Sequence, residues 1–328
     1  MKIKLLLAAL EADYAGHLSD VLSQKYADTF EVCVCTAKDR ILTNNKFDIA
    51  LIEPDFWSPE NIGPDTLVML LVEDGDGTSP PEIKKICKYQ RISAIVEDML
   101  GEYSAKGKMP QRANSHMAHI VAVWSPAGGA GKTTVALAYA ANRAAADKRA
   151  TYLNLENFAS TPAYFQGGGT SISKVFEKLE NSGGIFISAM RQTDASSQIS
   201  YFCAPENYDD MNILSGVDLE TLILACAADT DELVVDLSSQ CDERTAKIFE
   251  LADKILLVCE PSSAAQAKLG QFAGQHDVFG KIQHKLVLVD NKGANTKKLG
   301  IENTIGLPYV PSADPVAIFM ALSKQSFD

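Results

Sequence analysis

A glycine-rich loop near the middle of the chain constrains its fold more than any other feature. The loop reads GGAGKTT, follows the apolar run Ile120–Trp124 and precedes the helical pattern Val135–Ala140. A strand, a glycine loop and a helix in this order are the context of a phosphate-binding loop. We therefore predict that phosphates are bound by Gly128, Gly129, Ala130, Gly131, Lys132, Thr133 and Thr134.

The residue types in this loop suit a nucleotide with its magnesium ion. Glycines let backbone N–H groups surround an anion, and the helix N-terminus adds a partial positive charge. Lys132 is expected to reach the β- and γ-phosphates, and the Thr133 hydroxyl to ligate Mg²⁺. The other interpretation is a turn that only connects strand to helix, but a Lys-Thr pair directly after the glycines argues against it. We therefore expect ATP and Mg²⁺ as cofactors.

The loop departs from the common phosphate-loop pattern. A GxxxxGK[ST] motif would begin with glycine at position 126, where this chain has Pro126. The double glycine before GKTT resembles the deviant loop of the ParA/MinD superfamily, which reads KGGxGKTT. The lysine of that pattern is replaced here by Ala127. The resemblance covers residues 118–328 and implies a doubly wound α/β domain.

Later strands carry the acidic and amide groups that the resemblance implies at such a site. Asp236 ends the apolar run Leu233–Asp236 and is expected to hold Mg²⁺ together with Thr133. The family's DxD pair corresponds to Asn154 and Glu156, so Glu156 is expected to act as base or to position water. Asn154, Glu156 and Lys132 form the predicted catalytic set. The other interpretation is that Asn154 and Glu156 are ordinary polar residues at a strand end, because the sequence pattern would be the same.

Two further segments are implied to lie near the base. The strand-like run Leu286–Asp290 is followed by Asn291 and Lys292, and the family uses such an asparagine to read the adenine edge. A closing Pro-rich segment contains Pro311, which the resemblance also places near the nucleotide.

The region before the loop predicts a separate domain. At 328 residues the chain can bury two cores. Short apolar runs alternate with helical patterns such as Ala15–Lys25, which indicates a parallel sheet covered on both faces. The expected strands are Ile3–Ala8, Phe30–Cys35, Ile49–Ile52, Leu67–Val72 and Ile86–Tyr89, followed by a helix over Ile92–Leu100. We assign residues 1–101 to this domain, 102–117 to a polar linker and 118–328 to the second domain.

The first domain resembles the receiver domains of response regulators. Receivers carry a phosphoryl-accepting aspartate at the end of the third strand, and Glu53 stands there in this chain. Glutamate supplies a permanent charge but forms no aspartyl phosphate. The acidic pair that receivers place after the first strand is missing or displaced near Glu11, and Lys88 lies where receivers keep a lysine. The resemblance therefore implies a pseudo-receiver that docks or dimerises.

A pseudo-receiver followed by a ParA/MinD-like domain resembles the TadZ/CpaE proteins of tad-type (Flp) pilus assembly. This implies an ATP-binding factor that acts as a homodimer with pilus or secretion assembly proteins at the cell pole. The resemblance leaves open whether ATP is hydrolysed slowly or only bound. The alternative is an active ParA/MinD-type partition or positioning ATPase, which Ala127 argues against because that family's lysine acts in hydrolysis.

Charge and cysteine content agree with an acidic protein of the cytoplasm. The net charge of −12 argues against a broad nucleic-acid-binding surface. Seven cysteines form no CxxC pair, so free thiols in a reducing compartment are expected. No apolar run approaches the roughly 20 residues of a membrane span.

Overall fold

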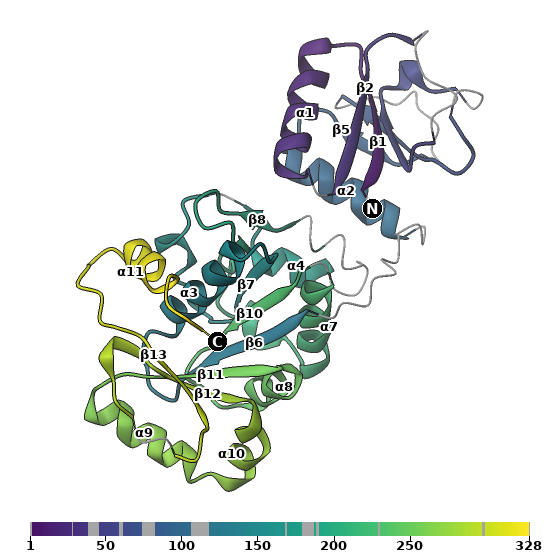
Figure 1. The fold of residues 1–328 in the computed structure, drawn as a ribbon. Coiled ribbons are helices and arrows are strands. Elements are labelled where there is room, and N and C mark those ends of the chain that lie inside the picture. The colour runs from purple at the N-terminus through teal and green to yellow at the C-terminus, as the bar shows by residue number, and fades with distance from the viewer. Residues whose placement is uncertain are drawn as a thin grey trace. The chain divides into compact units, whose positions relative to one another are not determined.

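The structure is a computed structural model that describes residues 2–27, 29–38, 46–58, 62–73, 83–105, 118–167, 169–178, 187, 190–228, 230–296 and 299–327. The chain divides into two compact units. The amino-terminal unit comprises residues 1–115 with 181–190, and the carboxy-terminal unit comprises residues 116–180 with 191–328. Each unit is an α/β structure built on its own sheet (Figure 1).

The amino-terminal unit contains a five-stranded sheet in which every described pairing is parallel. Its strands lie in the order β2-β1-β3-β4-β5, a doubly wound order in which β2 is added on one side of β1 and β3 to β5 on the other. The strands are β1 (Ile3–Ala8), β2 (Phe30–Cys35), β3 (Ile49–Ile52), β4 (Leu67–Val72) and β5 (Lys85–Cys87). The described helices are α1 (Ala12–Lys25), the short 3₁₀ helix η2 (Pro54–Phe56) and α2 (Ile92–Ala105).

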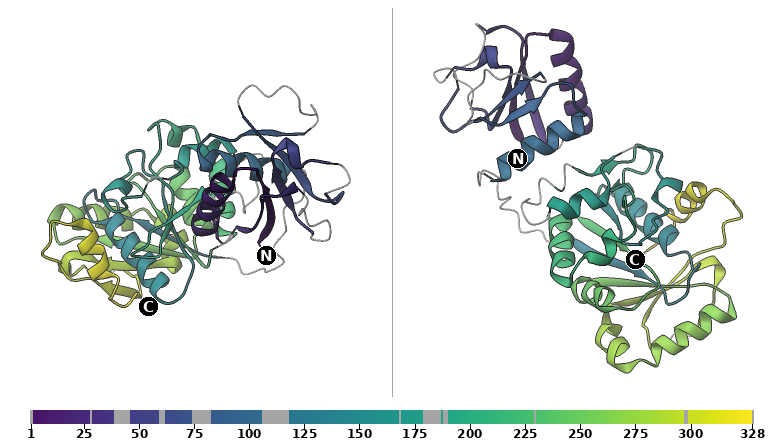
Figure 2. Two further views of the ribbon diagram at one scale, coloured as in Figure 1. Left: turned by 90° about the horizontal axis from the view of Figure 1, so that it is seen from above. Right: turned by 180° about the vertical axis from the view of Figure 1, so that it is seen from behind.

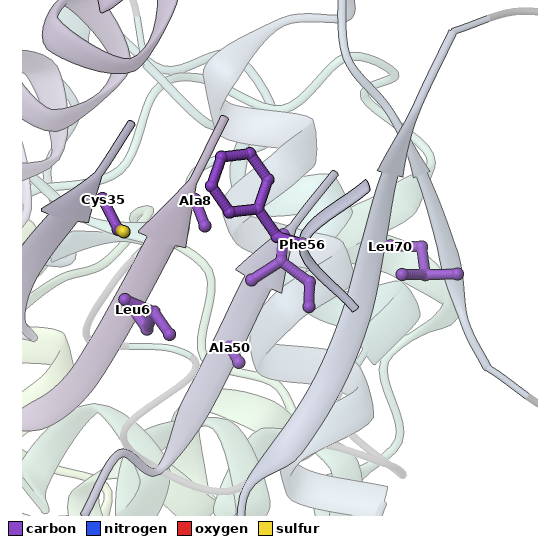
Figure 3. Packing of buried hydrophobic residues seen from close by; sticks show 7 residues of the cluster. Leu6, Ala8, Cys35, Ala50, Phe56 and Leu70 are labelled. Atoms are coloured by element: carbon purple, nitrogen blue, oxygen red, sulfur yellow. The ribbon is translucent and has the colours of Figure 1, made fainter. Parts of the chain in front are cut away.

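One face of this sheet is covered by a cluster of buried side chains. Phe56, carried by η2 after β3, belongs to this cluster together with alternate residues of β1 and β3 (Figure 3). Alternate residues share a face because successive strand side chains point to opposite sides. The cluster comprises Leu6, Ala8, Cys35, Ala50, Ile52, Phe56 and Leu70.

Four predicted strands of this unit are confirmed at their bounds, but its closing helix is longer than expected. Helix α2 continues to Ala105, so residues 102–105 of the predicted linker are helical. Tyr103 explains the extension, because it lies one turn beyond Met99 and continues the buried stripe of Ile95 and Met99. Residues 106–117 of the predicted linker lie outside the described residues.

The carboxy-terminal unit contains an eight-stranded sheet in the order β13-β12-β11-β6-β10-β7-β9-β8. Its pairings are parallel except for the short outer pair β8 and β9. The buried strand β6 (His119–Trp124) lies between β10 (Glu232–Asp236) and β11 (Lys254–Cys259). The remaining strands are β7 (Ala150–Asn154), β8 (Gln192–Thr193), β9 (Ser200–Tyr201), β12 (Leu286–Asp290) and β13 (Asn303–Gly306).

Helices cover both faces of this larger sheet (Figures 1 and 2). Helices α3 (Lys132–Ala145) and α11 (Pro315–Leu322) pack together on one face, and α7 (Gly216–Ala227) and α8 (Glu243–Leu251) pack together on the other. Trp124 is buried against Phe249 of α8 and Phe272 of α9 (Ser263–Ala273). The other described helices are α4 (Ile172–Lys178), α6 (Asp210–Ile213), α10 (His276–Ile282) and the 3₁₀ turns η3 (Thr161–Ala163), η4 (Gln283–Lys285) and η5 (Asn291–Gly293).

The predicted α/β architecture with parallel sheets is therefore confirmed. Within the described ranges, we find no helix both long and apolar enough to span a membrane. The carboxyl ends of the parallel strands in the larger sheet share one edge. Polar loops follow β6, β7, β10, β11 and β12 there, and doubly wound sheets bind their ligands at such an edge.

Candidate functional site

The glycine loop connects β6 to α3 and has the backbone shape that its sequence predicts. Gly129 and Gly131 adopt positive φ angles of 77° and 93°, and Gly131 is the N-cap of α3. Residues with a Cβ atom are sterically strained in this conformation, so glycine is favoured at both positions. In the part of the chain that the structure describes, no N–H group of residues 128–131 donates a hydrogen bond. These free N–H groups at a helix N-terminus can donate hydrogen bonds to an anion.

Lys132 begins α3 and directs its amine toward the ends of the neighbouring strands. The side chain is only 8% exposed. Its Nζ donates a 3.1 Å hydrogen bond to Ser239 Oγ and lies 3.9 Å from Glu156 Oε1. The predicted phosphate-binding lysine thus lies among the polar groups that follow β10 and β7.

Asp236 and Asn154 end adjacent strands and are paired in the register of β10 and β7. Asp236 Oδ2 accepts hydrogen bonds from the Tyr152 hydroxyl at 2.8 Å and from Asn154 Nδ2 at 3.2 Å. Asn154 also accepts the Glu156 N–H at its Oδ1. An aspartate at position 154 would repel Asp236, whereas the amide donates to it. These contacts orient Asp236, and a role of Asn154 in hydrolysis stays a prediction.

The second carboxylate oxygen of Asp236 fits a magnesium site. Oδ1 is buried and has no hydrogen-bond partner among the described residues. A buried oxygen without a partner is costly, and a Mg²⁺ ion with its waters would satisfy it. Burial raises the pKa of Asp236 to about 7, with a further increase from the negative charge of Glu156, while the Thr133 hydroxyl lowers it. Asp236 is therefore a residue that would hold the ion, and Thr133, whose hydroxyl lies near enough to lower the pKa of Asp236, stays the predicted second ligand.

Glu156 lies two residues beyond Asn154 and faces Lys132. Burial raises the pKa of its carboxyl, and the nearby Lys132 and Asn154 partly oppose the shift. A carboxylate with a raised pKa is suited to accept a proton from water. The geometry thus brings together Lys132, Asn154, Glu156 and Asp236, as the sequence predicts.

Asn291 contacts the glycine loop through its side chain. Its Nδ2 donates a 2.9 Å hydrogen bond to the Ala130 carbonyl, and its Oδ1 accepts the N–H of Lys292. A Cβ atom at Gly131 would lie 2.4 Å from this Nδ2. Asn291 therefore supports the loop, and the adenine-reading role that the resemblance implies stays a prediction.

Of the other predicted binding residues, Lys292 is hydrogen-bonded to the glycine loop through its side chain, whereas among the described residues Thr134 and Pro311 form no side-chain hydrogen bond to it. Lys292 Nζ donates to the Gly129 carbonyl at 3.0 Å and pairs with Glu260 at 2.9 Å. The Thr134 hydroxyl is joined to the Tyr164 hydroxyl by a 3.1 Å hydrogen bond. Pro311 is exposed between β13 and α11 and takes part in none of the loop contacts described above.

Sequence reasoning missed Tyr152 and Ser239. Burial and the adjacent Asp236 raise the pKa of Tyr152 well above its usual range, so its hydroxyl remains a donor. A signal was present, because residues two apart on a strand share a face and Tyr152 precedes Asn154 by two. Ser239 lies in the polar stretch Ser238–Gln240 after β10, where nothing distinguishes it from a surface serine.

We expect Gly131→Ala to lower the free energy of unfolding by about 1–2 kcal/mol, because alanine is strained at this φ angle. Its Cβ would also displace Asn291 from the Ala130 carbonyl. Gly128→Ala is the matched control, since a Cβ there meets no atom within 4 Å and should change stability by no more than about 0.5 kcal/mol. Denaturant unfolding measures both. Equal effects of the two substitutions would contradict the loop geometry.

The amino-terminal unit carries a second polar cluster at the carboxyl edge of its sheet. Lys88 is 4% exposed and lies 2.8 Å from Glu53 and 3.1 Å from Glu11. Burial opposes the charge of Lys88, but the hydrogen bonds to Glu53 and Glu11 raise its pKa above the ordinary value. The ring of Tyr14 lies 5.0 Å from the amine and adds a cation–π contact. This cluster joins the loops after β1, β3 and β5 in one ion-pair network.

Comparisons with known proteins identify a fold for much of the chain. No protein-family model matches it, and none of the curated proteins matches its sequence. A ParA family ATPase from Chlorobium tepidum matches with a TM-score of 0.55 and 16% identity over 64% of this chain and 94% of that one. The septum site-determining protein MinD from Pyrococcus horikoshii, complexed with Mg-ADP, matches with a TM-score of 0.48 and 11% identity over 63% and 95%.

A third match is cobyrinic acid a,c-diamide synthase from Mycobacterium smegmatis with an ATP analogue and magnesium. Its TM-score is 0.47 and its identity 16%, over 62% of this chain and 93% of that one. The similarity to the Chlorobium tepidum protein shows that this chain contains the α/β fold of the ParA ATPases. At 16% identity this similarity concerns the fold alone.

Proposed function

We propose that this protein is an ATP-binding localisation and assembly factor for tad-type (Flp) pilus biogenesis that acts as a nucleotide-bound dimer. The observation that carries nucleotide binding is the loop of residues 128–131, whose N–H groups have no protein partner within the described ranges. Lys132 and the unpartnered Asp236 Oδ1 lie beside it.

Slow or absent hydrolysis follows from the residues that this site lacks. Ala127 stands where the ParA/MinD pattern has a lysine, and it is buried. Asn154 is occupied with orienting Asp236. Removing one preorganised cation that stabilises a transferring phosphoryl group costs orders of magnitude in rate. Glu156 remains as the group that could position water.

We infer that the amino-terminal unit is a pseudo-receiver that docks to partners. Its strand order β2-β1-β3-β4-β5 supports this, because receiver domains use the same order. Glu53 holds a permanent charge at the end of β3 and is already paired with the buried Lys88. We further propose pilus or secretion assembly proteins at the cell pole as partners, within the cytoplasm.

The test of nucleotide binding is a titration of the full chain with ATP and ADP, each with and without Mg²⁺. We expect both nucleotides to bind, more tightly with Mg²⁺ because the ion would join the phosphates to Asp236. Hydrolysis on the same sample should stay below about 1 s⁻¹, the low end of kinase rates. Light scattering should give a dimer with ATP. No binding of either nucleotide, or a monomer throughout, would sink the proposal.

The pilus role is tested in the native cell. Deletion of the gene should abolish surface pili, and a fluorescent fusion should form a focus at the pole. The alternative, an active partition or positioning ATPase, predicts intact pili, faster hydrolysis and binding to nonspecific DNA. The acidic composition disfavours that DNA binding.

A further inference from the structure

Lys292 has a backbone conformation that its position in a surface turn does not explain. It lies directly after Asn291 with φ 56° and ψ 32°, in the left-handed backbone region that residues other than glycine seldom adopt. Its side chain is 39% exposed and that of its partner Glu260 is 22% exposed. An ion pair this exposed contributes little to stability, so it does not account for the strain. Strain of this kind persists where a functional geometry requires it.

The strained backbone brings the Lys292 amine to the glycine loop. Nζ donates to the Gly129 carbonyl at 3.0 Å and to Glu260 Oε2 at 2.9 Å. Glu260 follows β11 and is itself fixed by the Ser262 hydroxyl at 2.9 Å. The hydrogen bonds to Lys292 and Ser262 lower the pKa of the Glu260 carboxyl, which therefore stays charged. The amine is thus held between a carboxylate and the loop.

Two successive peptide units of the loop are held from the same side. Lys292 bonds the carbonyl of Gly129 and Asn291 bonds the carbonyl of Ala130. In a trans peptide the N–H points opposite to the C=O. The N–H groups of Ala130 and Gly131 therefore point away from residues 291–292, and within the described ranges neither of them has a protein acceptor. A cation bonded to a peptide carbonyl also polarises that peptide and makes its N–H a stronger donor.

We propose that Lys292, fixed by Glu260, is a positioning residue for the phosphates of the bound nucleotide. It holds the Gly129–Ala130 peptide with its N–H free for an anion, and it places beside the loop the positive charge that the chain lacks at Ala127. This inference rests on the proposed nucleotide binding. It assigns Lys292 a role within one subunit, acting through the loop and not through the adenine.

The test compares Lys292→Met, Lys292→Gly and Lys292→Arg in the full chain, with methylanthraniloyl-ATP and Mg²⁺ as the fluorescent probe. The Lys292→Met and Lys292→Gly variants should each bind the probe about tenfold more weakly, which matches the loss of one charge-assisted hydrogen bond. Arg keeps a charged donor and should stay within about threefold of wild type. Glu260→Gln should weaken binding less than Met does. Lys281→Met, which removes an exposed lysine on α10, is the matched control and should bind normally.

Thermal unfolding without nucleotide separates this role from a structural one. Lys292→Gly relieves the left-handed strain, so it should unfold at the wild-type temperature or above while binding the probe more weakly. If the Lys292 variants unfolded at a lower temperature than wild type but bound the probe with wild-type affinity, the ion pair with Glu260 would be structural and the inference would be overturned. Wild-type affinity in both Met and Gly variants would also overturn it. A wild-type protein that binds no probe would instead refute the proposed function and this inference with it.

Discussion

Replacing Lys132 with alanine should lower the affinity for ATP·Mg²⁺ by tenfold or more. The Lys132 amine is buried and directed at the strand ends, 3.1 Å from Ser239 Oγ. It is the charged donor at the start of α3, where the phosphates would lie. Charge-assisted hydrogen bonds contribute roughly 1.5–3 kcal/mol, which corresponds to a tenfold to hundredfold change in the dissociation constant. Calorimetric titration with ATP and Mg²⁺ measures the change.

The variant must also be shown to fold, because alanine leaves a space where the buried lysine stem lay. Circular dichroism and thermal unfolding without nucleotide serve this purpose. Lys281→Ala, at an exposed position of α10, controls for the loss of one positive charge from an acidic protein. Unchanged ATP affinity in a folded Lys132→Ala variant would contradict the assignment of the loop.

The sequence predicts the strands and the loop well because these carry local signals. Buried parallel strands read as apolar runs, as in Ile49–Ile52, and the glycine loop needs no long-range information. The two-residue strands β8 and β9 were not predicted, since so short a segment shows no periodicity. Helix α2 was predicted too short because Tyr103 lies among polar residues that resemble a linker.

The supports of the site could not be predicted from the sequence, because they join distant segments. Asn291 bonds Ala130 across 161 positions, and Lys292 bonds Gly129 across 163. Only the strand order, which places β11 beside β6 and β12 on the other side of β11, brings these residues together. The same holds for Tyr152 and Asp236, whose strands are adjacent although 84 positions separate the two residues. The residue types were visible in the sequence, but their partners were not.

Replacing Lys88 with methionine should destabilise the amino-terminal unit by about 3–5 kcal/mol. The amine is 4% exposed and bonded to the buried Glu53 at 2.8 Å. Removal of one partner leaves the other charge buried without compensation, which costs more than the intact pair contributes. Leu10 would still donate its N–H to Glu53 Oε2 at 2.8 Å, but one neutral donor does not replace a cation. Hydrogen exchange at β1 and β3, measured by mass spectrometry, reports this unit separately from the other.

Two further variants decide whether the effect comes from the buried charge. The double variant Lys88→Met/Glu53→Gln carries no unpaired charge at these positions and should be more stable than Lys88→Met alone. Glu73, which lies 3.8 Å from Lys88 but is 64% exposed, provides the control, and Glu73→Gln should cost no more than about 1 kcal/mol. A double variant as unstable as Lys88→Met alone would show that packing around the lysine stem, and not the charge of Glu53, holds these loops together. In that case Glu53 would be free to act independently of Lys88, and the closed ion-pair network that supports the pseudo-receiver assignment would lose its physical basis.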